Sequence, residues 1–172
     1  MREVPDVLAP GLRILFIGFN PGMRSAETGY HFAGYSNRFW KLLFTSGLTP
    51  HQLRPEESIT LPQYGYGITN IVSRPTRAAA EITKDEYRQG REELKVKLSR
   101  YRPCIAAYAG IGVYQEFAAR KEVACGQQSE AMVEGIIDFV LPSPSGLNRM
   151  LFDDQLQYYL SLRQLAEGLN KP

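Results

Sequence analysis

The sequence predicts a three-layer α/β/α fold with a central, mainly parallel sheet, in one domain that spans residues 1–172. Short, near-continuous apolar runs recur along the chain, and segments with helical periodicity lie between them. Strands buried on both faces have such continuous runs, and their alternation with helices is typical of parallel sheets. The length suits one domain with a sizeable core, and no linker rich in Pro, Gly or Ser divides the chain.

The first strand is predicted at residues 12–17, where leucine, isoleucine and phenylalanine form an apolar run. Asn20, Pro21 and Gly22 follow this run and end the strand. Ligands of open α/β sheets bind outside the carboxyl ends of the strands. Asn20 is therefore expected at the edge of the sheet where chemistry takes place.

The next stretch, residues 23–35, contains glycine and aromatic residues without helical periodicity, so a loop over the strand end is predicted. Ser36 or Asn37 can cap a helix that is apolar over a broad face and ends at Gly47. A polar connection with room for a short helical turn then leads to a glycine-interrupted strand at residues 64–72.

The middle of the chain carries a clear helix start. Thr83 and Glu86 form a capping-box pattern ahead of apolar residues at helical spacing, which predicts a helix up to Tyr101. A third buried strand is predicted at residues 104–109, and a further helix follows it and runs through Phe117.

The last third is less regular. Residues 118–134 are polar and fit either a loop or a small extra strand, and the last main strand is predicted at residues 136–141. Asp153 or Asp154 can cap a closing helix, and the tail after Leu169 is expected to fray. Because parallel strands end at one edge, the polar residues that follow three of the strands are expected to meet there.

The composition limits the possible functions. Apolar residues make up 44% and charged residues 22%, as in ordinary folded proteins, and 20 basic against 18 acidic residues leave a net charge of +2. Any nucleic-acid binding must therefore come from a local patch. Cys104 and Cys125 lack the paired spacing of metal ligands and are interpreted as buried or incidental thiols, so no metal is expected. The absence of an apolar signal core and of membrane-length runs predicts a cytoplasmic protein without membrane contact.

Asn20 is the first candidate catalytic residue. A carboxamide does not titrate near neutral pH, so it cannot abstract a proton, but its oxygen can accept a hydrogen bond from water and aim that water. The alternative is a residue that only forms the turn before Pro21. Gly22 likewise either satisfies the turn or lets a planar ligand approach the backbone.

Three further residues at this edge are candidates for binding a base. The Phe32 ring could stack on a nucleobase, and core packing is the alternative. Asn70 offers both a donor and an acceptor, the combination that reads an amide-like base edge, although it could equally satisfy backbone groups. His31 has no obvious partner, so a structural role is favoured over acid–base work.

The loop after the last strand is unusual because two prolines stiffen it and an apolar Leu147 lies among polar residues. Such a leucine is commonly tucked into the core, and the alternative is a wedge inserted into a base stack with Arg149 near phosphate. Arginines in or beside the strand-end loops are candidates for phosphate contacts. They are Arg24, Arg38, Arg74 and Arg77.

These motifs together resemble the mismatch-specific uracil-DNA glycosylases, a family that includes the thymine-DNA glycosylases. The resemblance covers nearly the whole chain and rests on the order and spacing of five segments. They are G-F-N-P-G at 18–22, the loop with Phe32, N-R-F-W-K at 37–41, G-I-T-N at 67–70 and P-S-G-L-N-R at 144–149.

The resemblance implies a uracil-DNA-glycosylase fold and removal of uracil, and of related bases, from mismatches with guanine in double-stranded DNA. It implies that Asn20 positions the hydrolytic water, that Phe32 stacks on the extruded base, and that backbone groups of Phe19 and Gly22 hold this base. His31 and Asn70 are expected beside the base. The wedge and its mismatch contacts are assigned to Ser143, Ser145, Gly146, Leu147, Asn148 and Arg149.

The sequence departs from the common family pattern at a few positions. Phe19 occupies a position that is more often isoleucine, and Ser143 stands where many bacterial members have asparagine. Ser143, Asn70 and His31 resemble the thymine-DNA branch, whereas Leu147 is the bacterial type of wedge. The substrate range beyond uracil is therefore left open.

The function expected from these residues is that of a monofunctional glycosylase, since no lysine occupies the Asn20 position. We expect no cofactor, a monomer that acts on damaged or mismatched duplex DNA, and a nucleoid location through that DNA. Two alternatives remain at this point. One is a flavodoxin-like nucleotide- or phosphate-binding module, although no phosphate-loop motif is present. The other is a non-catalytic protein that senses DNA distortion.

Overall fold

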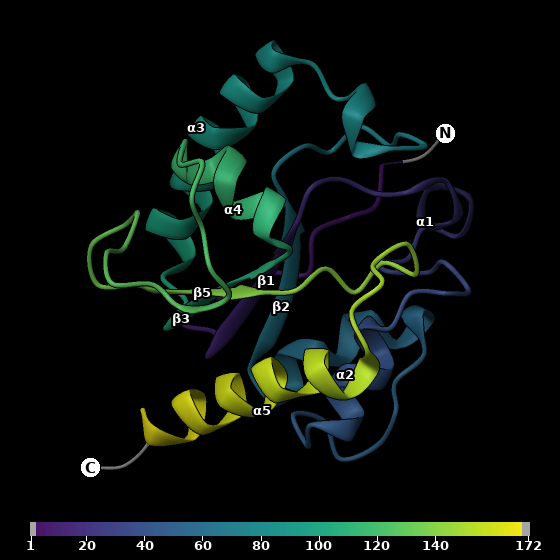
Figure 1. The fold of residues 1–172 in the computed structure, drawn as a ribbon, viewed down its shortest axis with the longest axis vertical. Coiled ribbons are helices and arrows are strands. Elements are labelled where there is room, and N and C mark those ends of the chain that lie inside the picture. Colours follow the sequence, from purple (N-terminus) through teal and green to yellow (C-terminus); the bar gives the residue numbers. More distant parts are fainter. Residues whose placement is uncertain (1–2, 170–172) are drawn as a thin grey trace.

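The computed structural model describes residues 3–169, which form a five-stranded sheet covered by helices on both faces (Figure 1). In sheet order the strands are β2 (Tyr66–Asn70), β1 (Ile14–Gly18), β3 (Ile105–Ala109), β5 (Ile137–Leu141) and β4 (Gly126–Gln127). The first four pair in parallel, and the two-residue β4 pairs antiparallel with β5. The predicted three-layer fold with a mainly parallel sheet is confirmed.

The helices divide between the two faces (Figure 1). One face is covered by α2 (Phe39–Thr45), the 3₁₀ segment η1 (Pro55–Tyr64) and α5 (Phe152–Gly168). The other face is covered by α3 (Lys84–Tyr101) and α4 (Ile111–Ala118). Two short segments, α1 (Met23–Thr28) and η2 (Ala79–Glu81), lie in the connections that follow β1 and β2.

The central strand β1 explains the apolar run seen in the sequence. Ile14 and Phe16 point into the core on the side of α2 and α5, whereas Leu15 and Ile17 point into the core on the side of α3 and α4. All four side chains are fully buried. Successive residues of a strand face opposite sides, so a strand covered on both faces needs apolar residues throughout.

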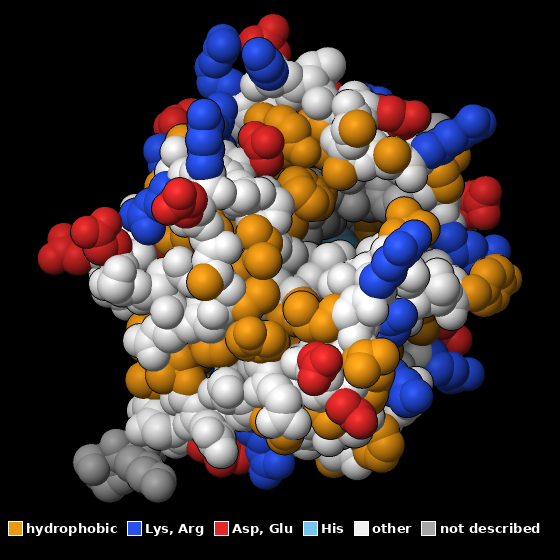
Figure 2. Space-filling model, in the orientation of Figure 1, with side chains coloured by type: hydrophobic (Ala, Val, Ile, Leu, Met, Phe, Trp, Pro, Cys, Tyr) orange, Lys and Arg blue, Asp and Glu red, His pale blue; other side chains and the backbone are white. Residues whose placement is uncertain are grey.

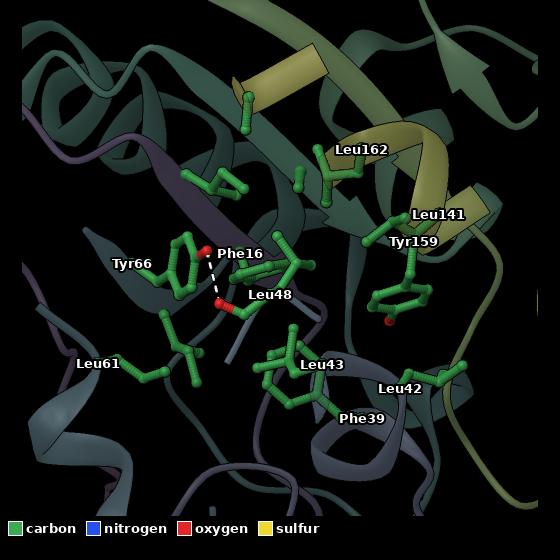
Figure 3. Packing of buried hydrophobic residues seen from close by; sticks show 14 of the residues in the cluster. Phe16, Phe39, Leu42, Leu43, Leu48, Leu61, Tyr66, Leu141, Tyr159 and Leu162 are labelled. Atoms are coloured by element: carbon green, nitrogen blue, oxygen red, sulfur yellow. Dashed lines mark hydrogen bonds between the residues drawn. The ribbon is translucent and has the colours of Figure 1, made fainter. Parts of the chain in front are cut away.

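Figure 3 shows the core on the side of α2 and α5, where two tyrosines differ in how their hydroxyl groups are satisfied. Tyr66 donates a hydrogen bond of 2.8 Å to the carbonyl of Leu48. The Tyr159 hydroxyl is fully buried and has no hydrogen-bond partner among residues 3–169. Its burial raises the pKa of this phenol. The core therefore contains one satisfied and one unsatisfied buried phenol.

Helix starts were predicted with mixed success. Thr83 accepts a hydrogen bond from Glu86 N and caps α3 as the capping-box pattern indicates. The closing helix α5 begins after Leu151, and no side chain caps it, so capping by an aspartate is wrong. Asp153 and Asp154 lie instead in its first turn, where carboxylates favour the positive end of the helix dipole.

The predicted loop at residues 23–35 contains the six-residue helix α1, which is a further correction. Only Ser25 and Ala26 are buried in α1, so the sequence of this helix has no apolar periodicity that would predict it. In the stretch 118–134 the small-strand alternative is correct, because β4 lies there. The frayed tail was expected beyond Leu169, outside the described residues.

Both outer edges of the sheet are partly covered. Val7 and Ile68 exchange two hydrogen bonds of 2.9 Å across an isolated antiparallel bridge, which covers the free side of β2. The opposite edge is the short strand β4. Cys104 is exposed and Cys125 is half-buried, so neither is a fully buried thiol, and both are free. Within residues 3–169 no helix has the length and apolar character needed to cross a membrane.

Candidate active site at the carboxyl edge of the sheet

The register of the sheet brings the predicted strand-end residues together. Gly18 at the end of β1 pairs with Asn70 at the end of β2, and Ser143 follows β5 at the same edge. A cavity of about 460 Å³ lies here, and its lining includes Asn20, Phe32 and Leu147. Figure 2 shows a hollow on this face, where the chain segments after β1, β2 and β5 converge in Figure 1.

A second hollow of about 630 Å³ lies beside this cavity and shares Phe19 and Ala79 with it. Its remaining lining comes mainly from α3 and α4, and it contains none of the strand-end amides. Binding sites combine apolar walls with convergent polar groups at the carboxyl ends of strands. We therefore regard the smaller cavity, called here the site cavity, as the candidate active site.

The amide of Asn20 is held in one orientation. Its Nδ2 donates to the carbonyl of Arg74 at 2.7 Å and to Thr76 Oγ1 at 2.8 Å. The carbonyl can only accept, which identifies the nitrogen side of the amide. Both amide hydrogens are thereby used, and Oδ1 accepts no hydrogen bond from residues 3–169. An acceptor oxygen remains available in the lining of the site cavity.

Thr76 is in turn fixed by its surroundings. Its hydroxyl donates to the carbonyl of Ala78 at 2.8 Å, so its lone pairs are directed to Asn20 Nδ2. The side chain of Thr76 is buried, with 4% of its surface exposed. Its backbone N–H also donates to the carbonyl of Pro21 at 3.2 Å. The segment after β2 therefore holds the turn after β1 through both backbone and side chain.

The carbonyl that accepts the second Asn20 hydrogen belongs to Arg74, and this residue is itself anchored. Its guanidinium donates to Glu86 in a two-pronged pair, with Nη2 to Oε2 at 3.0 Å, and to the carbonyl of Glu81 at 3.1 Å. The hydrogen bond from Arg74 lowers the pKa of Glu86 to about 2. Arg74 therefore ties the candidate water-positioning residue to the start of α3.

Gly22 has no conformational need for glycine. Its φ of −76° and ψ of 175° are open to any residue. A Cβ built there meets no described atom within 4 Å. The turn interpretation of Gly22 thus loses its physical basis, whereas close approach of a ligand to the backbone remains a reason for glycine.

The side chain of Phe19 points away from the strand-end amides. Its ring packs edge-on against Tyr87 with centroids 6.3 Å apart and covers Gly112, where a Cβ would approach the ring to 2.8 Å. The ring belongs to the core on the side of α3 and α4. Phe19 also belongs to the lining of the site cavity.

Phe32 combines an unusual backbone with a stacked ring. Its φ of 50° lies in the left-handed region, which a phenylalanine rarely adopts. Its ring stacks on that of Phe39 with centroids 4.1 Å apart and an interplanar angle of 22°. Phe39 is fully buried and also meets Phe16 and Trp40 edge-on. The core therefore supports Phe32 from one side, and the ring is part of the cavity lining.

His31 is neutral and nearly buried, with 4% of its surface exposed. Its Nε2 lies 2.7 Å from the carbonyl of Pro5, so Nε2 carries the hydrogen and Nδ1 carries the lone pair. Burial lowers the pKa of His31, and the Pro5 hydrogen bond and Asp6 oppose this effect. The structural partner that the sequence did not reveal is thus Pro5, and the ring still contributes to the site cavity.

Asn70 lies against the end of β1. A Cβ on Gly18 would approach Asn70 Oδ1 to 2.6 Å, so a side chain at Gly18 would displace the Asn70 amide. Asn70 lines the site cavity and a neighbouring hollow between the N-terminal segment and α3. The expected position of Asn70 beside a bound base is consistent with this placement.

The loop of residues 143–149 is held by hydrogen bonds of its own. The Leu147 N–H donates to Ser145 Oγ at 3.2 Å, and the Ser145 N–H donates to Ser143 Oγ at 3.3 Å. Asn148 uses both ends of its amide within and directly after the loop, since Nδ2 donates to the Ser143 carbonyl and Oδ1 accepts from Met150 N. Leu147 is 93% exposed, so the interpretation that it is tucked into the core is wrong.

The candidate phosphate-binding arginines differ in what they already bind. Arg74 is paired with Glu86, and Arg38 Nη1 donates to carbonyls of the 143–149 loop. The Arg24 guanidinium lies 4.6 Å from the centroid of the Tyr35 ring and 3.8 Å from Glu27. Within residues 3–169 the guanidinium groups of Arg77 and Arg149 have no hydrogen bond or ion pair, and both residues are exposed.

Two supporting residues were missed in the sequence. Thr76 carries no local signal, because its role depends on a contact with Asn20 across 56 positions. Phe39 was assigned only to a core-facing helix, although its ring backs Phe32. Among residues 3–169 no group of three or more His, Cys, Asp or Glu side chains is placed to hold a metal ion.

The fold and the site cavity define an α/β/α protein with a partly aromatic pocket at the carboxyl edge of its sheet, beside a loop with an exposed leucine. The same fold is found in a solution structure from Methanosarcina acetivorans, a protein provisionally assigned as a uracil DNA glycosylase. It is 20% identical, the match covers 95% of this chain and 97% of that chain, and the TM-score is 0.64. The chain belongs to the uracil DNA glycosylase superfamily, whose family model matches residues 5–165.

Membership in this superfamily decides between the functions left open by the sequence. The protein is a DNA N-glycosylase, a hydrolase of DNA repair that acts on DNA with damaged bases. The nucleotide-binding module and the non-catalytic distortion sensor are the less favoured alternatives, because the family is defined by an enzymatic activity.

Proposed function

We propose that this glycosylase removes uracil from mismatches with guanine in double-stranded DNA and leaves an abasic site. The observation that carries the proposal is the fixed amide of Asn20, whose Nδ2 is bound by Arg74 and Thr76 while Oδ1 remains unpartnered in the site cavity. This oxygen accepts a hydrogen bond from water and directs the water at the sugar. A turn-forming asparagine would not need two partners on its nitrogen.

The extruded base stacks on one face of the Phe32 ring, and the Phe39 ring packs against the opposite face. A base stacked on an aromatic side chain gains about 1–3 kcal/mol. Backbone groups of Phe19 and Gly22 contact the base edge, and open space in front of Gly22 permits this approach. At the same cavity His31 Nδ1 provides a hydrogen-bond acceptor, and the Asn70 amide provides both a donor and an acceptor.

The reaction needs no ionised side chain. The bond between C1′ and N1 breaks, the electron pair leaves with the base, and the water held by Asn20 adds its hydroxyl to C1′. The proton released by water neutralises the base anion. Stabilisation of the departing anion and of the cationic sugar supplies the catalysis, so good leaving groups react fastest. Among residues 3–169 no lysine lines the site cavity, so no covalent intermediate with a lysine forms and the enzyme is monofunctional.

Mismatch preference arises when the base leaves the stack. Extrusion costs a few kcal/mol and costs least for a mispaired base. Leu147 is 93% exposed and fills the vacated space, and the loop backbone around it contacts the orphaned guanine. Asn148 contributes by holding the loop, since both ends of its amide are used there. Arg77 and Arg149, with unpaired guanidinium groups within residues 3–169, contact phosphate.

Single-turnover cleavage tests this proposal with three substrates: uracil opposite guanine, uracil opposite adenine, and single-stranded uracil. Wild type should produce alkali-labile sites fastest from the guanine mismatch, and Asn20→Ala should slow this reaction roughly 100-fold. Gln157→Ala, which removes an exposed amide on α5, is the matched control and should retain the wild-type rate.

The outcomes separate the parts of the proposal. If wild type releases no uracil from any substrate, the assigned substrate is wrong. If it treats guanine and adenine partners equally, the mismatch preference is wrong. Full activity of Asn20→Ala would contradict the water-positioning role while leaving the substrate intact.

A further inference from the structure

Arg38 is bound to the 143–149 loop through both its backbone and its side chain. Its backbone N–H donates to the carbonyl of Pro144 at 2.9 Å. Its Nη1 donates to the carbonyls of Asn148 at 3.1 Å and Ser145 at 3.5 Å. One residue at the start of α2 therefore contacts three carbonyls of a loop that lies more than a hundred positions away.

These carbonyls have few other ways to be satisfied. The Ser145 carbonyl also accepts from Asn148 N at 3.0 Å, which closes a tight turn around Leu147. The Leu147 side chain does not hold the loop in place, because 93% of the surface of this residue is exposed. Without its guanidinium donor the loop would keep its internal hydrogen bonds and the backbone bond from Arg38 N–H to Pro144. Hydrogen bonds from a charged donor are the stronger ones in such a set.

The opposite side of the loop rests on the same segment. Gly146 lies so close to Ser36 that a Cβ at Gly146 would overlap the Ser36 side chain. Gly146 has no positive φ, so close packing and not an unusual turn is the reason for glycine here. Ser36 supports the tip of the loop, and Arg38 holds its two ends.

The supporting segment also belongs to the base-binding part of the site. Asn37 lies between the two supports, and its Oδ1 accepts from Phe39 N at 2.9 Å at the start of α2. Phe39 is the residue on which Phe32 stacks. The segment of residues 36–39 thus supports both the base-stacking ring of Phe32 and the loop that carries Leu147.

We propose that Arg38 is a positioning residue that holds the 143–149 loop as a pre-formed wedge and presents Leu147 to DNA. The inference rests on the proposed wedge role of Leu147. The sequence predicts a phosphate contact for Arg38, but its guanidinium is directed to loop carbonyls. Holding the loop before DNA arrives removes the entropy of ordering it during base extrusion.

The test combines Arg38→Gln with Leu147→Ala in single-turnover assays on the guanine mismatch and on single-stranded uracil. Arg38→Gln should slow duplex cleavage about tenfold and leave the single-stranded rate unchanged, because only the duplex needs a wedge. In the Leu147→Ala background the same change should have no added effect. Arg38→Lys should give an intermediate rate, and Arg100→Gln at the far end of α3 is the control.

A readout that does not depend on activity completes the design. Amide exchange of Leu147 N–H and Asn148 N–H should accelerate in Arg38→Gln, while the exchange of β1 amides stays unchanged. Unchanged loop exchange would overturn the inference even if the enzyme is active on uracil. Multiplicative effects of Arg38→Gln and Leu147→Ala, or equal losses on both substrates, would also overturn it. Failure of wild type to release uracil would instead count against the proposed function.

Discussion

Asn20 and Thr76 are joined by a hydrogen bond of 2.8 Å, in which the amide Nδ2 donates to the hydroxyl oxygen. Because Thr76 donates its own hydrogen to Ala78, this oxygen can only accept from Asn20. A rotated amide would place its oxygen against another oxygen and lose the interaction. The hydroxyl group of Thr76 therefore helps to set the orientation of the candidate water-binding group.

Replacement of Thr76 by valine should reduce cleavage of mismatched uracil by roughly tenfold to 100-fold, because the Asn20 amide then keeps only the Arg74 carbonyl to fix its orientation. Thr76→Ser keeps the hydroxyl and should restore most of the activity. Single-turnover rates with saturating enzyme measure this effect apart from DNA binding. Equal losses in the valine and serine variants would indicate a packing role for Thr76 instead of an orienting one.

Gly22→Ala should separate folding from activity. A Cβ at Gly22 meets no described atom within 4 Å, so thermal unfolding should occur at the wild-type temperature. Cleavage should fall because the added methyl group occupies the space of the base. The paired measurement is the melting temperature and the single-turnover rate of each protein. Gly168→Ala is the control, because a Cβ at Gly168 also meets no described atom within 4 Å, and this variant should be active.

Arg77→Gln should change the salt dependence of DNA binding. Each phosphate contact releases counterions, so loss of one contact lowers the slope of log affinity against log salt by about 1. Titrations of a mismatched duplex at several salt concentrations provide this slope. Arg100→Gln, on the far end of α3, should leave it unchanged. An unaltered slope in Arg77→Gln would show that its guanidinium does not reach phosphate.

The buried neutral histidine predicts a loss of stability in acid. Burial lowers the pKa of His31 below the unfolded value of 6.5, so the unfolded chain binds a proton more readily than the folded one. The unfolding free energy should therefore fall as the pH drops below about 6.5. Denaturant titrations from about pH 5 to about pH 8 should show a weaker dependence in His31→Gln. A dependence that disappears in His51→Gln instead would contradict this assignment.

Two tyrosines of one core allow a matched stability test (Figure 3). Tyr159→Phe removes a buried hydroxyl that has no partner in the described part of the chain, so it should raise the unfolding free energy by about 1 kcal/mol. Tyr66→Phe breaks the hydrogen bond to Leu48 and should lower it by about 1 kcal/mol. Urea denaturation measures both values. The same sign for both variants would contradict the assigned hydrogen bonding.

The sequence was most informative where local patterns decide the structure. The strand at Ile14–Gly18 was evident because burial on both faces demands an unbroken apolar run, and Thr83 with Glu86 marked a helix start through contacts three residues apart. The gathering of strand-end residues at one edge followed from parallel pairing. These features depend on short spacings or on topology, and both can be predicted from the sequence.

Features that depend on contacts between distant residues could not be predicted from the sequence. Nothing near Arg74 indicates that Glu86 binds its guanidinium, and nothing near Gly146 indicates that Ser36 lies beneath it. The left-handed backbone of Phe32 was also unforeseen, since phenylalanine does not favour it. The direction of the Asn20 amide needed the positions of its partners, which sequence spacing cannot supply.

The covered edges of the sheet have a consequence for behaviour at high concentration. Val7 occupies both hydrogen-bonding groups of Ile68 on the outer side of β2, and β4 offers only two residues on the other side. Unpaired strand edges are the usual template on which one chain adds to another and begins an aggregate. Partial cover at both edges protects the sheet against edge-to-edge association. Val7→Pro, which removes the N–H that bonds to Ile68, should therefore cause faster aggregation during heating.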